Sequence, residues 1–207
     1  MSQLVLPLRL ADHAVFASFF EHGNESLVAT LSDIAHGATD SHGCWIWGAA
    51  STGKTHLLQA ICHTVLRRDP NARVLYMSCV DFTNSYIQAI QAHQIDNFRD
   101  YHRGADVLVI DDVQFLANKE KTQDEFFHTF NALHSSGRQI VVTADRYPKD
   151  IEGLEERLRS RFDWGLVADV QPPDTETKVA ILRKKSDEEG IELPQDVAFF
   201  IARHASS

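Results

Sequence analysis

Short apolar runs alternate along the chain with longer segments whose apolar positions recur every three or four residues. The runs predict β-strands, and the longer segments predict amphipathic helices. The predicted strands cover residues 44–47, 73–78, 106–111, 139–143 and 166–170. The predicted helices cover residues 25–34, 55–66, 81–91, a segment that starts near Thr122, and 154–160.

The alternation of strands with helices predicts a parallel sheet that carries helices on both faces. The segment 106–111 is almost continuously apolar, which is typical of a strand buried on both faces. Thr122 and Glu125 have the spacing of a capping box, so we expect the helix that carries Phe126 and Phe130 to begin there. The expected fold is α/β, with a five-stranded parallel sheet.

Two consecutive prolines, Pro172 and Pro173, interrupt the pattern after the last predicted strand. A helix is predicted over 174–189, where Gly190 ends it, and another begins at Pro194. We expect these helices to form a small subdomain that the 207 residues include only in part. The expected organisation is a leader, an α/β domain and a partial helical lid, over residues 1–12, 13–171 and 172–207.

The composition narrows the class of protein. The net charge of −9 argues against broad binding to duplex DNA, which needs a basic face, although it leaves room for a small basic patch. Three separated cysteines indicate reduced thiols, and no apolar run approaches the roughly 20 residues of a membrane span. We therefore expect a cytoplasmic protein with no membrane partner. No histidine pair has zinc-site spacing, so we predict no structural metal.

Residues 48–55 read GAASTGKT, which matches the phosphate-loop pattern GxxxxGK followed by Ser or Thr. The match lies between a predicted strand and a predicted helix, where backbone N–H groups can surround phosphates. Lys54 would reach the β- and γ-phosphates, and Thr55 would ligate Mg²⁺. The alternative is a chance match in a loop of small residues. The expected nucleotide-binding residues are Gly48, Ala49, Ala50, Ser51, Thr52, Gly53, Lys54, Thr55 and His56.

Two acidic residues, Asp111 and Asp112, end the apolar strand 106–111. Asp111 is well placed to hold Mg²⁺, directly or through water. Asp112 could orient or deprotonate an attacking water molecule. An Asp-Asp turn at a strand end is the alternative, and the upstream phosphate loop favours the functional interpretation.

Five further segments resemble the AAA+ module of the DnaA/Hda family. They are IDDVQFLANKE at 110–120, QDEFFHTFNAL at 123–133, TADRYP at 143–148, RLRSRFDWGL at 157–166 and PPDTETKVAIL at 172–182. They follow in the order of the family, and the resemblance covers residues 45–204. It implies a P-loop AAA+ domain that binds ATP or ADP with Mg²⁺ and associates with further subunits.

The resemblance also implies roles for individual residues. Arg161 corresponds to the arginine finger, which completes the site of a neighbouring subunit, and Arg157 to a nearby interface arginine. Asp145 corresponds to the first sensor, and the segment 16–24 to the stretch that touches adenine. The alternatives are a solvated basic face for the arginines, a turn at Asp145, and plain core aromatics in the segment 16–24.

Two further positions fall where DnaA proteins contact single-stranded DNA. They are Ile87 and Lys121, a pairing of an apolar with a basic side chain that suits base stacking and phosphate contact. The alternative is a solvated loop around Lys119 and Lys121.

Two segments near the start of the chain, QLVLPL at 3–8 and FASF at 16–19, resemble the start of the Hda branch of the family. In that branch the leader binds the DNA polymerase sliding clamp. A glutamine followed by aliphatic residues in an extended segment can fill an apolar groove with a polar rim. The alternative is an edge strand or a frayed terminus. The expected clamp-binding residues are Gln3, Leu4, Leu6, Pro7 and Leu8.

Three functional hypotheses follow. The first is an Hda-like regulator of bacterial replication initiation, which binds the clamp and uses Arg161 to promote hydrolysis of ATP on DnaA. The second is a DnaA-like initiator that binds ATP, self-assembles and contacts single-stranded DNA. The third is an adaptor that binds nucleotide only as a structural ligand, without turnover. The resemblance places the second sensor arginine of the family beyond residue 207, so we expect these 207 residues to bind nucleotide more weakly.

Overall fold

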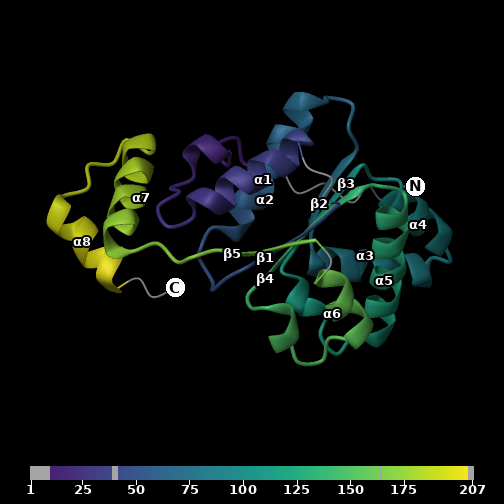
Figure 1. Ribbon diagram of the computed structural model, residues 1–207. Helices are drawn as coiled ribbons and strands as arrows, with labels where there is room; N and C mark the ends of the chain where they lie inside the picture. The colour runs from purple at the N-terminus through teal and green to yellow at the C-terminus, as the bar shows by residue number, and fades with distance from the viewer. Residues whose placement is uncertain (1–9, 39–41, 164, 205–207) are drawn as a thin grey trace.

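One parallel β-sheet organises the protein. The computed structural model describes residues 10–38, 42–163 and 165–204, and it orders the strands β2-β3-β4-β1-β5 (Figure 1). All strand pairs are parallel, which confirms the predicted five-stranded α/β fold. The strands are β1 Gly43–Trp47, β2 Val74–Ser78, β3 Val107–Asp111, β4 Gln139–Ala144 and β5 Leu166–Asp169.

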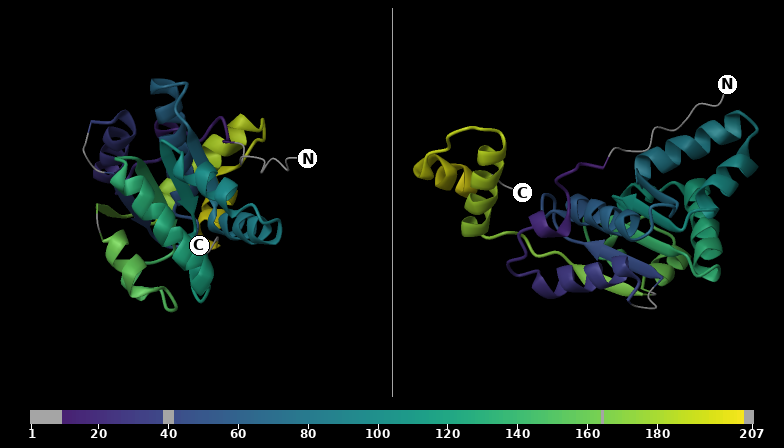
Figure 2. Two further views of the ribbon diagram at one scale, coloured as in Figure 1. Left: turned by 90° about the vertical axis from the view of Figure 1, so that its right-hand side faces the viewer. Right: turned by 90° about the horizontal axis from the view of Figure 1, so that it is seen from above.

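Helices cover both faces of the sheet, as the alternation predicts (Figures 1 and 2). Side chains alternate between the faces along a strand, so Cys44 and Ile46 pack in the cluster that contains α1 and α2, whereas Trp45 packs with α3, α5 and α6. The helices are α1 Glu25–His36, α2 Lys54–Arg68, α3 Cys79–Gln91, α4 Ile95–Arg103, α5 Glu120–Ser135, α6 Glu156–Phe162, α7 Thr175–Glu188 and α8 Gln195–His204.

The last two helices lie beside the body formed by the sheet and its helices (Figures 1 and 2). They pack on each other around their own small cluster, formed by Val179, Ala198 and Ala202. The chain reaches α7 through an extended segment after β5 that contains Pro172 and Pro173. This arrangement places one side of α7 next to the loop that follows β1, which matters for the site described below.

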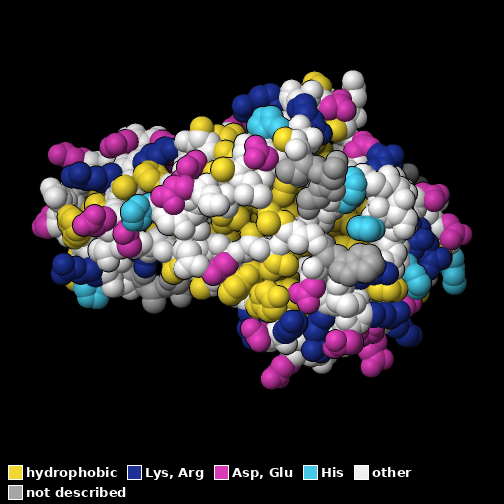
Figure 3. All heavy atoms as spheres, in the orientation of Figure 1, with side chains coloured by type: hydrophobic (Ala, Val, Ile, Leu, Met, Phe, Trp, Pro, Cys, Tyr) yellow, Lys and Arg dark blue, Asp and Glu magenta, His cyan; other side chains and the backbone are white. Residues whose placement is uncertain are grey.

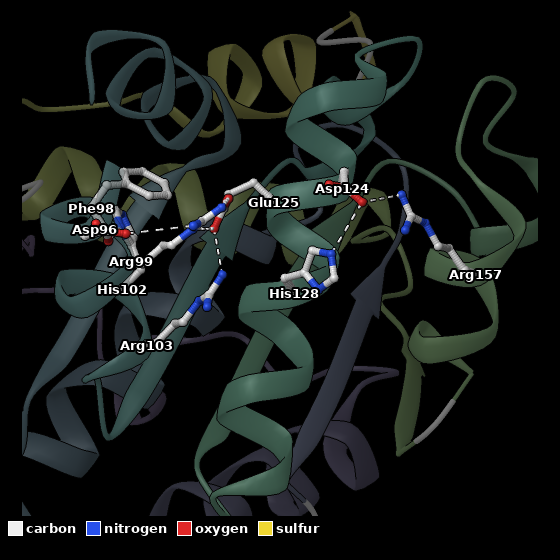
Figure 4. Close-up of polar contacts among 9 residues, drawn as sticks. All are labelled: Asp96, Phe98, Arg99, His102, Arg103, Asp124, Glu125, His128 and Arg157. Carbon is white, nitrogen blue, oxygen red and sulfur yellow. Dashed lines mark hydrogen bonds and ion pairs between the residues drawn. The ribbon is translucent and has the colours of Figure 1, made fainter. Parts of the chain in front are cut away.

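The structure corrects the predicted capping box. α5 begins at Glu120, so Thr122 and Glu125 lie inside the helix and are buried, and no side chain caps its first turn. The carboxylate of Glu125 instead accepts hydrogen bonds from Arg99 and Arg103 of α4 (Figure 4). The pattern did not predict α4 at all, because only Phe98 and His102 of its nine residues are buried.

The surface carries charges of both signs. On the face that Figure 3 shows, Lys and Arg side chains are interspersed with Asp and Glu side chains over α7 and α8 and around α6. The three cysteine thiols are buried, and burial raises the pKa of each to about 12. None of the helices in the described part of the chain combines the length and the apolar character that a bilayer span needs.

Candidate functional site

The loop between β1 and α2 depends on two glycines. Gly53 has a φ of 97°, and a Cβ atom there would lie 2.7 Å from Cε2 of Phe19. A Cβ atom on Gly48 would lie 2.7 Å from the carbonyl oxygen of Val170. Since both the backbone conformation and the packing leave no room for a side chain, only glycine allows the loop to turn into the N-terminus of α2.

Lys54 lies at that helix start and is only 8% exposed. Its Nζ atom donates hydrogen bonds to the carbonyl oxygens of Gly48 and Ala49, each at 2.7 Å. Burial lowers the pKa of Lys54, and the nearby carboxylates of Asp112, Asp111 and Asp145 act in the opposite direction. The ammonium therefore lies inside the loop, within the field of the three predicted acidic residues.

Thr55 and Asp111 meet at the carboxyl end of the sheet. Thr55 Oγ1 donates a hydrogen bond to Asp111 Oδ2 at 2.7 Å, and Asp111 is 7% exposed. A hydroxyl and a carboxylate are hard oxygen donors, which are the ligands that Mg²⁺ prefers. The two residues predicted as metal ligands thus lie side by side with the right donor chemistry.

Asp112 follows in the left-handed region, with a φ of 59°. Its Oδ1 atom accepts a hydrogen bond from Gln114 Nε2 at 3.0 Å, and its backbone N–H donates to Thr143 Oγ1 at 2.9 Å. Thr143 was not among the predicted site residues, although it is a polar side chain near the end of an otherwise apolar strand.

A cavity of about 250 Å³ opens beside the loop. Three parts of the chain line it: the segment before α1, the loop with the start of α2, and the linker with α7. The lining residues are His13, Ser18, Phe19, Phe20, His22, Asn24, Ser51, Thr52, Gly53, His56, Gln171, Pro173, Ile181, Lys184, Lys185 and Glu188. Much of the predicted adenine segment 16–24 therefore borders the cavity, whereas Phe16 packs against the core around α1 and α2.

Two contacts join the segment before α1 to the far side of the cavity. The side-chain amide of Asn24 accepts from the backbone N–H of Gln171 at 2.8 Å and donates to the Gln171 carbonyl at 3.1 Å. Lys184 Nζ lies 5.5 Å from the ring centroid of Phe20 and 3.4 Å from the carbonyl oxygen of Ser18. No local sequence pattern marks Asn24 or Lys184 individually as a residue of the site, because their partners are far away along the chain.

The aromatic wall of the cavity is tied to α2. Phe19 and His56 lie with ring centroids 5.5 Å apart. His56 Nε2 lies 2.9 Å from the carbonyl oxygen of Val15 and 3.2 Å from Ser18 Oγ. Burial is the main cause that lowers the pKa of His56. The first turn of α2 therefore carries both the loop lysine and a histidine that orders the neighbouring segment.

Asp145 lies just beyond β4 and accepts two hydrogen bonds from Arg146, at 2.9 and 2.8 Å. These bonds are the main cause that lowers the pKa of Asp145, and Lys54 adds to the effect. The predicted sensor is thus an ionised carboxylate near the loop lysine.

The predicted finger and interface arginines lie elsewhere. Arg161 borders a small cavity at the amino-terminal start of β1, and its guanidinium lies 5.8 Å from the ring centroid of Phe127. Arg157 pairs with Asp124 at 2.8 Å (Figure 4). Its guanidinium also lies 4.8 Å from the ring centroid of Phe127. Among the described residues that line the large cavity, neither arginine appears.

The remaining predicted residues are separate from the cavity or outside the described residues. Ile87 is 45% exposed on α3, and Lys121 is exposed in the first turn of α5. Neither lines the large cavity. The predicted clamp-binding residues Gln3, Leu4, Leu6, Pro7 and Leu8 lie outside the described residues.

Most of the chain matches one protein-family model. The sequence model of the bacterial DnaA ATPase domain matches residues 10–169. The chain belongs to the DnaA ATPase domain family. A chromosomal replication initiator protein DnaA from Geobacter metallireducens is 55% identical over 179 residues, which cover 86% of this chain and 40% of that protein. The chain therefore spans about two fifths of the length of such DnaA relatives.

Solved DnaA structures share the fold. Domain III of Thermotoga maritima DnaA matches with a TM-score of 0.88 and 39% identity, over 94% of this chain and 82% of that one. A replication initiator DnaA bound to AMPPCP and single-stranded DNA matches with a TM-score of 0.82 and 33% identity, over 95% of this chain and 61% of that one. These DnaA matches confirm the predicted family and the AAA+ fold.

Proposed function

We propose that this chain is the ATP-binding module of a DnaA-type replication initiator. The observation that carries the proposal is the convergence of Lys54, Thr55 and Asp111 on a loop that opens into the cavity. Relatives named as replication initiators, including one solved with an ATP analogue, support it. As a replication initiator it would act in the cytoplasm, where bacterial chromosomes are replicated.

Each residue of the site has a part in this function. The loop amides and Lys54 would hold the β- and γ-phosphates, and the cavity would take the adenosine. Mg²⁺, held by Thr55 and Asp111, would neutralise phosphate charge. Asp112 would orient the attacking water and accept its proton.

The test of binding is calorimetry with ADP and with ATP in the presence of Mg²⁺. Lys54→Ala removes a largely buried ammonium that would contact the phosphates. We expect the loss to cost about 2–4 kcal/mol, or roughly 30- to 1000-fold in affinity. Lys121→Ala changes an exposed lysine of the same charge and is the matched control. If the folded protein takes up neither nucleotide, or if Lys54→Ala binds like the wild type, the proposal fails.

The position of Arg161 supports hydrolysis at an interface between subunits. It borders the start of β1, whereas the phosphate loop follows the end of that strand, so it would reach the nucleotide of a second subunit rather than its own. A mixing experiment tests this. Lys54→Ala and Arg161→Ala variants should each be inactive alone, while a mixture should hydrolyse ATP. In the mixture the Lys54→Ala subunit supplies Arg161, and the Arg161→Ala subunit supplies the bound nucleotide. A mixture as inactive as its components would refute a role in trans.

Contact with single-stranded DNA is a further part of the initiator proposal. The apolar Ile87 and the basic Lys121 are both exposed, and a DnaA relative was solved with single-stranded DNA. Ile87→Ala and Lys121→Ala should each weaken binding of an unlabelled single-stranded oligonucleotide in the presence of ATP. Lys149→Ala serves as the control. The regulatory hypothesis rests on the clamp contact of Gln3 to Leu8 together with the action of Arg161 on DnaA, and the relatives that are named as DnaA initiators favour the initiator instead.

A further inference from the structure

Thr143 of β4 occupies a position between the phosphate loop and the two acidic residues. β4 lies between β1 and β3 in the sheet, and Thr143 is paired with Ile46 of β1. In the register of β3 with β4, Ile110 is paired with Val142, so Thr143 stands opposite Asp111. The side chain of Thr143 is completely buried.

The hydroxyl of Thr143 forms hydrogen bonds with both Asp111 and Asp112. The backbone N–H of Asp112 donates to Thr143 Oγ1 at 2.9 Å. The single hydroxyl proton of Thr143 donates to Asp111 Oδ1. One side chain thus bonds two consecutive residues that are predicted to have different tasks.

These bonds restrict both acids. Asp111 has one carboxylate oxygen on Thr143 and the other on Thr55, so its carboxylate plane cannot rotate without breaking a hydrogen bond. Asp112 lies in the left-handed region at a φ of 59°, a conformation that a residue with a side chain adopts only when its surroundings support it. The hydrogen bond to its N–H is part of that support.

We propose that Thr143 is a positioning residue that orients the Asp111 carboxylate toward Mg²⁺ and the Asp112 carboxylate toward the attacking water. The inference rests on the proposed function. Residues that hydrogen-bond a metal ligand orient that ligand and thereby influence the affinity for the metal.

The protein offers a matched control in Thr129 of α5. Thr129 is also completely buried, but its hydroxyl has no hydrogen-bond partner within the described residues. Thr129→Val and Thr143→Val therefore make the same isosteric change at two buried sites. Only the second removes hydrogen bonds from the acids.

The experiment measures the Mg²⁺ concentration that half-saturates binding of a fluorescent ATP analogue, together with ADP binding in EDTA. Thr143→Val should need roughly 10- to 100-fold more Mg²⁺. This is the loss of metal affinity expected when a residue that hydrogen-bonds a metal ligand is removed. Its metal-free ADP binding and thermal unfolding should stay close to those of Thr129→Val. Thr143→Ser retains the hydroxyl and should restore the wild-type Mg²⁺ requirement.

Two results would overturn the proposal. One is a folded Thr143→Val with the wild-type Mg²⁺ requirement. The other is a loss of ADP affinity in EDTA as large as the loss measured with Mg²⁺, which would indicate a merely structural role. Should Thr143→Val not fold, the comparison of Thr143→Ala with Thr143→Ser decides in the same way. A wild-type protein that binds no nucleotide at all would refute the proposed function instead, so the two failures are distinguishable.

Discussion

Glu125 of α5 and Arg99 of α4 form a two-pronged ion pair, with Arg99 Nη2 2.8 Å and Nε 3.1 Å from Glu125 Oε2 (Figure 4). The Glu125 side chain is only 2% exposed, and Arg103 donates to its other oxygen at 2.8 Å. A buried carboxylate is costly unless it is paired in this manner. The pair therefore fixes α4 on α5 while the guanidinium groups still reach the surface.

Replacing Glu125 should destabilise the fold. Glu125→Gln removes the charge that two arginines share, and we expect the free energy of unfolding to fall by about 2–3 kcal/mol. The loss is at the lower end for a buried pair because Arg99 and Arg103 are 40% and 30% exposed. Urea unfolding followed by circular dichroism measures it.

The neighbouring residue provides the control for that measurement. Asp124 pairs with Arg157 at 2.8 Å, but its side chain is 53% exposed. Asp124→Asn makes the same chemical change one position earlier and should cost less than about 1 kcal/mol, as is usual for a surface pair. Equal losses for the two variants would contradict the assignment of Glu125 as the anchor of α4.

His102 should make the stability depend on pH. Burial lowers its pKa to about 4, and its Nε2 atom has no hydrogen-bond partner in the described part of the chain. In the unfolded chain the pKa is about 6.5, so between these values the unfolded state binds a proton that the folded state does not. The stability that neutral His102 contributes is therefore complete above about pH 6.5 and is lost as the pH falls toward 4, by at most about 3 kcal/mol.

The measurement is a series of urea unfolding curves from pH 7, above the pKa of His102 in the unfolded chain, to about pH 4.5, just above its pKa in the folded protein. His102→Gln carries no charge there, so its unfolding free energy should fall less steeply on acidification than that of the wild type. His128 is 55% exposed on α5, and His128→Gln is the matched control. Parallel curves for His102→Gln and the wild type would show that His102 is not protonated on unfolding.

Asn24 should couple the cavity to the linker before α7. Asn24→Ala removes both hydrogen bonds to the Gln171 backbone from a side chain that is 5% exposed, so we expect a loss of about 1–3 kcal/mol in stability. ADP binding should weaken about fivefold, because part of the binding free energy would be spent on ordering the cavity wall. Asn71→Ala, at an exposed turn, is the control. Unchanged ADP affinity in a destabilised Asn24→Ala would limit its role to folding.

The features that could be predicted are those whose signal lies within one stretch of sequence. Residues 48–55 contain the whole phosphate loop, and the apolar run before Asp111 marks a strand buried on both faces. The prediction of a helix start at Thr122 and Glu125 was wrong, because it rested on their spacing alone. The partners of Glu125 are Arg99 and Arg103, which are 26 and 22 residues away, and no local pattern shows them.

By itself, then, the sequence determined where strands and helices alternate along the chain, the phosphate loop and the family motifs. Periodicity and turn chemistry act between near neighbours, which is why a local pattern reveals them. Only the tertiary structure decided which side chains complete the site. Thr143 bonds Asp111 across 32 residues and Asn24 bonds Gln171 across 147. Such contacts arise when parallel strands bring their carboxyl ends to one edge and the chain returns to it, so their geometry exists only in the folded sheet.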